Sequence, residues 1–274
     1  MSRPTTAPSA KARTARQASV GLVLFQKEIR EVLRTSRIYV IPGLFLFFGL
    51  LSPITAKMMP QLLKSLGAPG GVQITLPPPT ALDAFTQLFK NLTQTGVIAV
   101  ILTVMGALAE EKNRGTAVLV VSKPVSRSAM VWAKLASNSL LITFATALSY
   151  VAALYYSMIL FPGTPVRESL FGTFALLVYL LFVGAMTIAA SAVARSQVAA
   201  GGLALAGYFL ISLLPILGRF FAKWTPGALV RLQTELLAGK ASMLQDAVPT
   251  MSVAVALGLV LVALGSAVFE KQEL

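Results

Sequence analysis

The sequence predicts an all-α integral membrane protein with six transmembrane helices, preceded by an amphipathic helix at the membrane interface. Hydrophobic residues make up 56% of the 274 residues, and the mean hydropathy is +0.77. Charged residues make up only 12%, which is about half the share of a typical soluble domain. The apolar residues also gather in long runs that a soluble core does not need. The length suits a single membrane domain.

Six apolar segments are the expected spans. Each is long enough to cross about 30 Å of hydrocarbon as a helix, which takes roughly 20 residues. Because backbone groups in lipid must be paired within the segment, helices are expected rather than open strands. Pro42 and Pro53 predict a kink or an early end in the first segment, and only a very short turn at Arg195 separates the fourth from the fifth. The segments are Ile38–Ala56, Asn91–Ala109, Leu135–Phe161, Ser169–Ala194, Ser196–Gly218 and Ala247–Phe269.

The residues before the first span divide into two parts. Residues 1–18 are rich in Pro, Ser, Thr, Ala, Lys and Arg, which predicts a disordered basic tail. Residues 19–37 have apolar side chains at helical spacing with charged residues between them, which predicts an amphipathic helix lying in the membrane interface. The expected apolar face is Leu22, Phe25, Ile29 and Leu33, and the expected polar face is Lys27, Glu28, Arg30, Glu31 and Arg34.

The distribution of Lys and Arg predicts the orientation. Six spans put both termini on one side, and that side carries 15 of the 23 Lys and Arg residues. Positively charged loops favour the cytoplasm, so both termini are expected there, with external elements at residues 57–90 and 218–245. The net charge of +13 is then explained by cytoplasmic loops and anionic lipid headgroups. Nucleic acid is not an expected partner, because no basic stripe alternates with stacking aromatic residues.

The residue types present exclude several kinds of chemistry. The chain has no cysteine and no histidine, which removes thiol nucleophiles, imidazole bases and the commonest zinc ligands. The six segments contain no Asp, Glu, Lys or Arg, whereas ion-coupled carriers use ionisable groups inside the membrane. The nearest string to a phosphate-binding loop, Gly239-Lys240-Ala241, lacks the upstream glycine and the hydroxyl. We therefore expect no catalytic residue, metal or cofactor in this chain, and an energy source outside the spans.

The segment between the second and third expected spans is the most informative part of the sequence. Charged residues flank a short apolar run, Val118–Val121, which Pro124 ends. The run is too short to span a membrane, and Thr116 can cap a brief helix whose apolar side must contact lipid or protein. The alternative is a plain charged loop, in which Glu110 and Glu111 form a solvated helix end.

This segment resembles that of the permease subunits of ABC transporters of the type-two exporter class. The shared pattern is Glu-x-x-x-Gly-Thr, an apolar turn, Pro-x-x-Arg and a Lys seven residues later. The resemblance covers nearly the whole chain, including Gln26-Lys27-Glu28-Ile29 before the first span and Thr225-Pro226 between the fifth and sixth. It departs at Val118, where many relatives carry an acidic residue. The residues of the expected coupling site, near 111–127, are Glu111, Gly115, Thr116, Leu119, Pro124, Arg127 and Lys134.

The resemblance implies a function and partners. In that family the segment is a coupling helix that docks on a separate ATPase subunit, which holds the ATP and Mg. The chain would then be the permease of an ATP-driven exporter in the cytoplasmic (inner) membrane of a prokaryote, paired with a second permease in a homodimer or heterodimer. The first and fifth spans would form the contact between permeases. Small residues that allow close helix approach there, or that pack within the chain, are Ala200, Gly201, Gly202 and Ala206.

Two other functions stay open at this point. A mechanical module of the same family would transmit ATP-driven motion to an extracytoplasmic protein, and the external elements suit that role. A membrane enzyme acting on lipid would need acid, base or metal-binding groups that converge at headgroup level. Polar residues inside the spans are expected to form hydrogen bonds between helices, and the sequence does not show which of them line a transport path.

Overall fold

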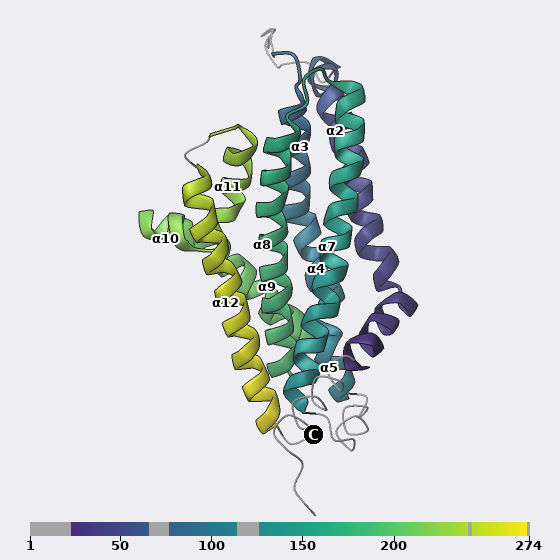
Figure 1. Cartoon of the computed structure of the whole chain (residues 1–274), viewed down its shortest axis with the longest axis vertical. Coiled ribbons are helices and arrows are strands. Elements are labelled where there is room, and N and C mark those ends of the chain that lie inside the picture. Colours follow the sequence, from purple (N-terminus) through teal and green to yellow (C-terminus); the bar gives the residue numbers. More distant parts are fainter. Residues whose placement is uncertain (1–22, 66–76, 114–125, 241–242, 273–274) are drawn as a thin grey trace, which may run out of the picture.

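The computed structural model describes residues 23–65, 77–113, 126–240 and 243–272. Every regular element in these residues is a helix, and six stretches are long and apolar enough to cross a membrane (Figure 1). The predicted all-α fold with six spans is therefore confirmed. The six stretches are Arg37–Leu62, Ala81–Lys112, Arg127–Leu160, Val166–Val193, Gln197–Leu217 and Ala247–Lys271.

The spans form an up-and-down bundle around α8 (Val166–Val193). Helix α2 (Arg37–Ser65) packs along α7 (Arg127–Leu160), and α12 (Met243–Lys271) packs along α8 (Figure 1). The start of α7, the turn after α8 and the end of α12 lie at one end of the bundle. The turn between α7 and α8 lies at the other end, as six antiparallel spans require.

The first span does not end early. Pro42, Pro53 and Pro60 all lie inside α2, which continues to Ser65. The early end expected from the prolines is therefore wrong, because neighbouring groups in a membrane bundle can pair the backbone that a proline leaves free. The fourth and fifth spans are separate helices, as expected. Ser196 begins the fifth by accepting a hydrogen bond from the Ala199 amide (3.2 Å).

The second span is built from four helical pieces. They are α3 (Ala81–Asn91), the π-helix η1 (Leu92–Gly96), α4 (Val97–Val104) and α5 (Gly106–Asn113). The helix thus begins ten residues before the expected span, because Thr80 and Asp83 form a capping box at its start. The segment before the expected span and the span itself form one continuous helix except for a break at Met105.

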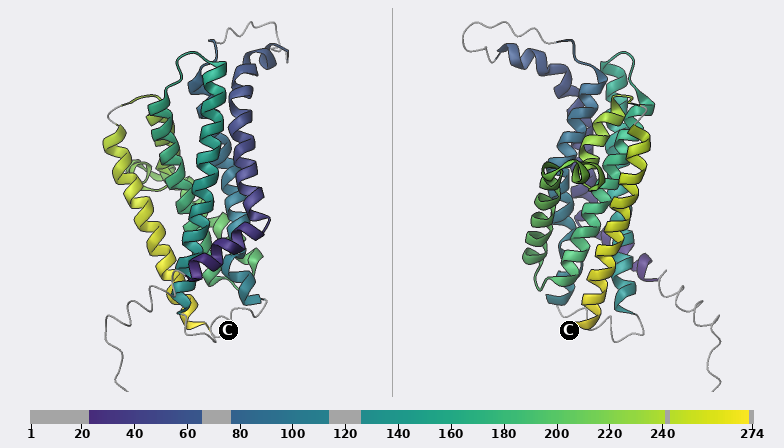
Figure 2. Two further views of the ribbon diagram at one scale, coloured as in Figure 1. Left: turned by 45° about the vertical axis from the view of Figure 1, so that its right-hand side comes forward. Right: turned by 90° about the vertical axis from the view of Figure 1, so that its left-hand side faces the viewer.

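The chain between the fifth and sixth spans folds back on itself. Helix α9 (Gln197–Leu213) continues into a 3-10 turn, η2 (Leu214–Leu217), and then into α10 (Arg219–Trp224) and α11 (Ala228–Leu237). Figures 1 and 2 show α10 lying across the side of the bundle, part-way along its length.

Residues 23–34 are helical and cross the lower end of the bundle at an angle (Figure 2). Leu24, Glu28 and Val32 are the buried positions, whereas Leu33 is exposed. Glu28 was expected on the polar, outward face, so that part of the prediction is wrong. The interfacial position of this helix stays a prediction, and residues 1–18 lie outside the described residues.

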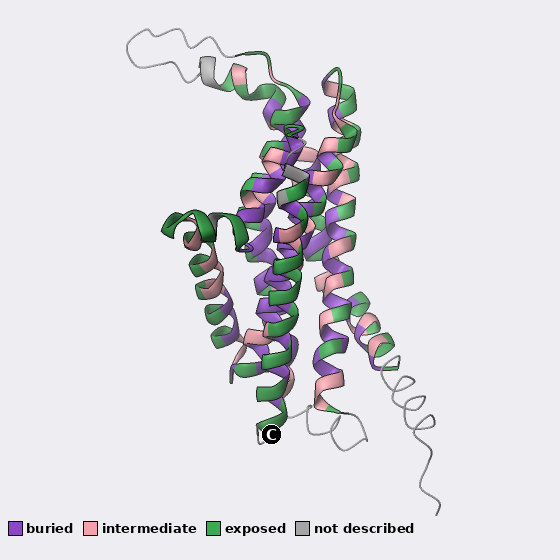
Figure 3. Ribbon diagram, turned by 60° about the vertical axis from the view of Figure 1, so that its left-hand side comes forward, coloured by how far each residue is buried: buried purple, intermediate pink, exposed green. Residues whose placement is uncertain are grey.

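Several hydroxyl groups inside the spans bond within their own helix. Thr143, Thr146 and Thr187 each donate to the carbonyl four residues earlier at 2.7–2.8 Å. The expected bonds between helices occur at other positions, among them Tyr150, whose hydroxyl donates to the Val166 carbonyl (3.2 Å). The buried positions line the inside of the bundle, and the outward faces of the spans are exposed (Figure 3).

Candidate coupling site

A buried lysine joins three elements at the lower end of the bundle. The side chain of Lys134, near the start of α7, is only 2% exposed. Its Nζ lies 2.9 Å from Glu28 Oε2 in the helix of residues 23–34 and 2.8 Å from Glu111 Oε1 in α5. A buried charge is tolerated when it is paired and hydrogen-bonded, so Lys134 holds α7 against both other elements.

A second cation completes this group, which we call the charge cluster: Lys27, Glu28, Glu31, Glu111 and Lys134. Lys27 Nζ lies 3.0 Å from Glu28 Oε1, 3.4 Å from Glu31 Oε2 and 3.5 Å from Glu111 Oε1. Burial opposes the charge on Lys27, but its hydrogen bond to Glu28 and the nearby carboxylates outweigh burial and raise its pKa. Burial likewise opposes the charge on Glu31, yet Lys134 and Lys27 lower its pKa. Both residues are therefore charged at neutral pH.

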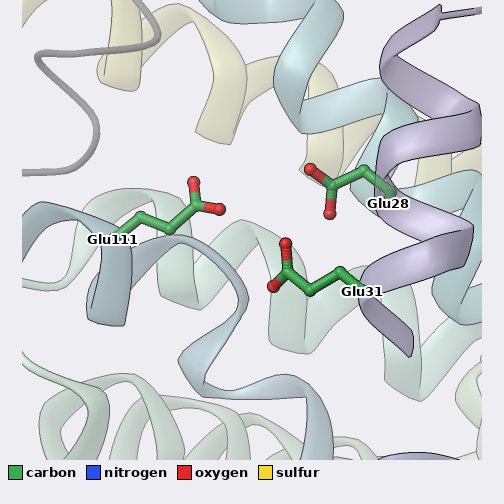
Figure 4. A group of neighbouring side chains, drawn as sticks. All are labelled: Glu28, Glu31 and Glu111. Carbon is green, nitrogen blue, oxygen red and sulfur yellow. The ribbon is translucent and has the colours of Figure 1, made fainter. Parts of the chain in front are cut away.

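The three carboxylates converge closely enough to raise the question of a metal. Oxygens of Glu28, Glu31 and Glu111 lie within 4.8 Å of one another (Figure 4). The ammonium groups of Lys27 and Lys134 contact these same carboxylates and supply the positive charge that a metal ion would bring. We therefore interpret the group as a network of ion pairs.

Glu111 does not form the solvated helix end of the alternative interpretation. Its side chain is 17% exposed and pairs with a buried lysine from another span. Glu110 is more exposed, and its Oε2 lies 3.8 Å from Arg37 Nη2. The alternative fails for Glu111 because its partner, Lys134, is 23 residues away and approaches only when the bundle folds.

The break at Met105 is bridged by one side chain of α8. Ser191 Oγ accepts from the amides of Leu108 and Ala109, both at 3.0 Å, and donates to the Met105 carbonyl (2.8 Å). The first amides of a helix have no partner within that helix, so Ser191 supplies what the break removes from α5. The break therefore allows α5 to run in a different direction from α4 while it stays hydrogen-bonded to α8.

Two further cations cap helix ends beside this site. Lys112 Nζ donates to the carbonyls of Ala192 (2.9 Å) and Ala194 (2.6 Å) at the end of α8. Arg127 donates through Nη1 to the carbonyls of Glu270 (3.3 Å) and Gln272 at the end of α12. Cations at helix C-termini pair with the free carbonyls and complement the helix dipole.

The structure brings together part of the predicted coupling site. Glu111 and Lys134 are in contact, and Arg127 lies at the base of α12. Glu28 was not among the predicted site residues, although its spacing from Leu24 and Val32 places all three on one helix face. Lys112 was not among them either, and no sequence pattern indicates its role. The predicted site residues that lie outside the described residues are Gly115, Thr116, Leu119 and Pro124.

The predicted subunit-contact residues divide between two faces of α9. Ala200 and Gly201 are buried within the chain, and a Cβ at Gly201 would lie 2.6 Å from Met105 Sδ. Gly202 and Ala206 are exposed, and a Cβ at Gly202 would have no neighbour within 4 Å. Contact between subunits stays a prediction. Of these four residues, only Gly202 and Ala206 are exposed and can take part in it directly.

Six apolar helices define a multi-pass integral membrane protein. The model of the ABC-2 family transporter proteins matches residues 22–274, and the chain belongs to that family. The resemblance stated from the segment at 111–127 is thereby confirmed. The uncharacterized transmembrane protein YxlG of Bacillus subtilis (strain 168) is 29% identical over 143 residues. The match covers 52% of this chain and 55% of that protein, about half the length of each.

Proposed function

We propose that this chain is the transmembrane permease subunit of an ATP-driven exporter, and that the segment at 111–127 docks on a separate ABC ATPase subunit. The observation that supports coupling is that residues at both ends of this segment contact the bundle. At its beginning, Glu111 belongs to the charge cluster and Lys112 donates hydrogen bonds to the end of α8. At its end, Arg127 donates hydrogen bonds to the end of α12, and Lys134, further along α7, belongs to the charge cluster.

These contacts connect the described ends of the segment, and the start of α7 that follows it, to most of the bundle. A displacement of these ends would act on the helix of residues 23–34 through Lys134 of α7, on α8 through Lys112, and on α12 through Arg127. Removing one partner of a buried ion pair costs about 3–5 kcal/mol, because the other charge stays buried without compensation. An exposed pair contributes only about 0–1 kcal/mol. The contacts of Lys134 are therefore costly to separate.

The rest of the assembly follows from the family resemblance. Two permeases and two ATPases would form the working unit, with ATP and Mg in the ATPases and no chemistry in this chain. The permeases would meet through the first and fifth spans. Both termini would lie in the cytoplasm of a prokaryote, so that the charge cluster lies on the ATPase side of the cytoplasmic membrane.

The test separates docking from transmission. We expect Leu119→Asp to lose co-purification of the ABC ATPase that is retained by the affinity-tagged wild-type chain. Lys134→Met should keep the ATPase bound but remove the effect of the permease on ATP turnover, because the buried carboxylates lose their ammonium. Arg127→Ala should cost less than either, because the contacts of Arg127 among the described residues are with carbonyls at a helix end.

Two controls keep this test decisive. The triple variant Lys134→Met, Glu28→Gln, Glu111→Gln removes the charges together, so it separates lost transmission from misfolding caused by an unpaired charge. Arg231→Gln breaks an exposed pair with Glu235 in α11 and should change neither readout. Full association and coupling in both Leu119→Asp and Lys134→Met would contradict the proposal.

A further inference from the structure

The outward apolar faces of the spans do not all end at the same height. Heights can be compared from one level of α8, which both α7 and α12 contact. A Cβ at Gly184 in α8 would lie 2.9 Å from Ile142 Cδ1 of α7. A Cβ at Gly258 in α12 would lie 3.4 Å from the Cβ of Ala185, the next residue of α8. Ile142 and Gly258 therefore mark a common level, from which distances away from the charge cluster can be counted.

The apolar surface of α7 continues far beyond this common level. Every exposed residue of α7 from Trp132 to Ile159 is apolar or aromatic. Ile159 lies about 26 Å beyond Ile142 along the helix. A cation marks the end of this surface, because Lys57 of α2 donates from Nζ to the Leu160 carbonyl (3.0 Å). Lysine at the end of an apolar surface is typical of the lipid headgroup layer.

The apolar surface beside α9 and α12 ends much nearer to the common level. Within the described part of α12, the exposed apolar residues begin at Val248, about 15 Å beyond Gly258. In α9, a Cβ at Gly207 would lie 2.8 Å from Met186 Sδ of α8, which places Gly207 near the same level. The exposed apolar residues of α9 and η2 end at Leu217, again about 15 Å beyond Gly207.

Helix α10 lies at this lower boundary. It begins directly after Leu217 and Gly218, and the Thr250 hydroxyl of α12 donates to the Lys223 carbonyl (2.9 Å). Figure 1 shows α7 continuing well beyond the level of α10. Cations and aromatic rings occur together in the headgroup layer of membranes. The exposed residues of α10 are of these two kinds: Arg219, Phe220, Phe221, Lys223 and Trp224.

Two other surroundings suit α10 less well. Hydrocarbon on all sides would leave the guanidinium of Arg219 without polar partners, which is costly. Water on all sides would leave a group of large apolar side chains exposed, including Ile216 (77%), Leu217 (72%) and Phe220 (69%). The headgroup layer offers phosphates to the cations and hydrocarbon to the rings, so it satisfies both kinds of side chain.

We propose that α10 lies in the headgroup layer of the leaflet away from the charge cluster, and that this layer is about 10 Å lower beside α10 than beside the end of α7. The partner of α10 is phospholipid: phosphates attract Arg219 and Lys223, and the rings of Phe220 and Trp224 reach the edge of the hydrocarbon. The protein thus imposes a step on the surface of one leaflet. This contact requires neither the ATPase nor a second copy of the chain.

The two native tryptophans permit a direct test, because one lies on α10 and the other can be replaced. In Trp132→Phe, Trp224 is the sole tryptophan. In the matched variant Trp132→Phe, Trp224→Phe, Val151→Trp, the sole tryptophan lies on the exposed face of α7. Val151 and Thr250 both lie about 13 Å beyond the common level, so the two tryptophans have nearly the same height.

The measurement is the quenching of tryptophan fluorescence by brominated phosphatidylcholine in proteoliposomes. The bromines are placed either near the headgroups or near the middle of the bilayer. We expect bromines near the headgroups to quench Trp224 several-fold more strongly than bromines near the middle. The order should be reversed for Val151→Trp, because hydrocarbon surrounds α7 at that height. Insertion in both orientations does not affect the result, since both leaflets carry the brominated lipid.

Three results would overturn the step. Stronger quenching of both tryptophans by the deep bromines would place α10 within the hydrocarbon. Stronger quenching of both by the shallow bromines would mean that the leaflet surface is level. Quenching of Trp224 by neither lipid would mean that water or a second copy covers α10, and aqueous iodide would distinguish these two cases.

A second reporter guards against a variant that fails to fold. Trp132, Val151 and Trp224 are all exposed, so the yield of monodisperse protein should match that of the wild-type chain. If it does not, the variant Trp132→Phe, Trp224→Phe, Phe220→Trp places the sole tryptophan at another exposed position of α10. Bromines near the headgroups should again quench it more strongly, and the opposite order would contradict the proposal.

Discussion

The fourth and fifth spans are both apolar, and they are joined by only three residues, yet their surroundings are opposite. In α8, 72% of the most apolar stretch is buried within the chain, whereas in the fifth span, α9 with η2, the share is 17%. Hydropathy therefore shows that a helix crosses the membrane but not which neighbour it meets. Helix α8 is the centre of this chain, and α9 presents a surface that only lipid or another protein can cover.

Substitution of glycines on these two helices should give the largest difference in the yield of folded protein. At Gly172 in α8, a Cβ would lie 2.7 Å from the Gln233 carbonyl oxygen and 2.8 Å from the Phe89 ring. Gly172→Leu should therefore prevent correct folding, because overpacking a dense core is strongly destabilising. The readout is the yield of monodisperse protein after detergent extraction. A normal yield would show that α8 is less confined than the structure indicates.

Gly201 and Gly202, which are neighbours on α9, allow the buried and the exposed face of one helix to be compared. Gly202→Leu should leave the yield unchanged but weaken association of two permeases, because a Cβ at Gly202 would have no neighbour within 4 Å among the described residues. Gly201→Leu should instead lower stability, since its inner face contacts Met105. Crosslinking between differently tagged copies measures the first effect, and thermal unfolding in detergent measures the second. Unchanged crosslinking of Gly202→Leu would move the subunit contact away from this part of α9.

Substitution of serines on the two helices should give the smallest difference in stability. Ser191→Ala in α8 removes the partner of two buried amides, and each unsatisfied group costs about 1–3 kcal/mol. Ser212→Ala in α9 removes a bond to the carbonyl of Tyr208 in its own helix and a hydrogen bond with the Tyr179 side chain of α8, but it leaves no backbone amide without a partner and should therefore cost less. Hydrogen exchange of the Leu108 and Ala109 amides should rise in Ser191→Ala alone. Equal protection in both variants would mean that α5 is held by other contacts.

The sequence predicted the number of spans better than it predicted where the helices begin and break. The number and approximate position of the helices followed from the thickness of the hydrocarbon, which every span must match. The start of the second span was misplaced because Asp83 and Lys90 interrupt the apolar run, although the capped helix continues through them. The break at Met105 has no clear signal, because Ser191 in another span supplies the hydrogen bonds that permit it.

The charge cluster shows the same limit at the candidate site. The family pattern identified Glu111 and Lys134 separately. Glu28 was predicted to lie on the outward, polar face of the helix before the first span. Their contact depends on the angle at which that helix crosses the bundle, which no local spacing encodes. A residue type can thus be predicted as functional from a pattern, whereas its partner appears only once the helices are packed.

The outward apolar surface of α7 has a consequence for the surrounding bilayer. Exposed apolar side chains run from Trp132 to Ile159, about 40 Å along the helix. The hydrocarbon of a typical membrane is about 30 Å thick, so α7 must tilt or the lipid beside it must stretch. This tall face therefore favours long acyl chains beside α7. A thinner bilayer would require a larger tilt of this helix.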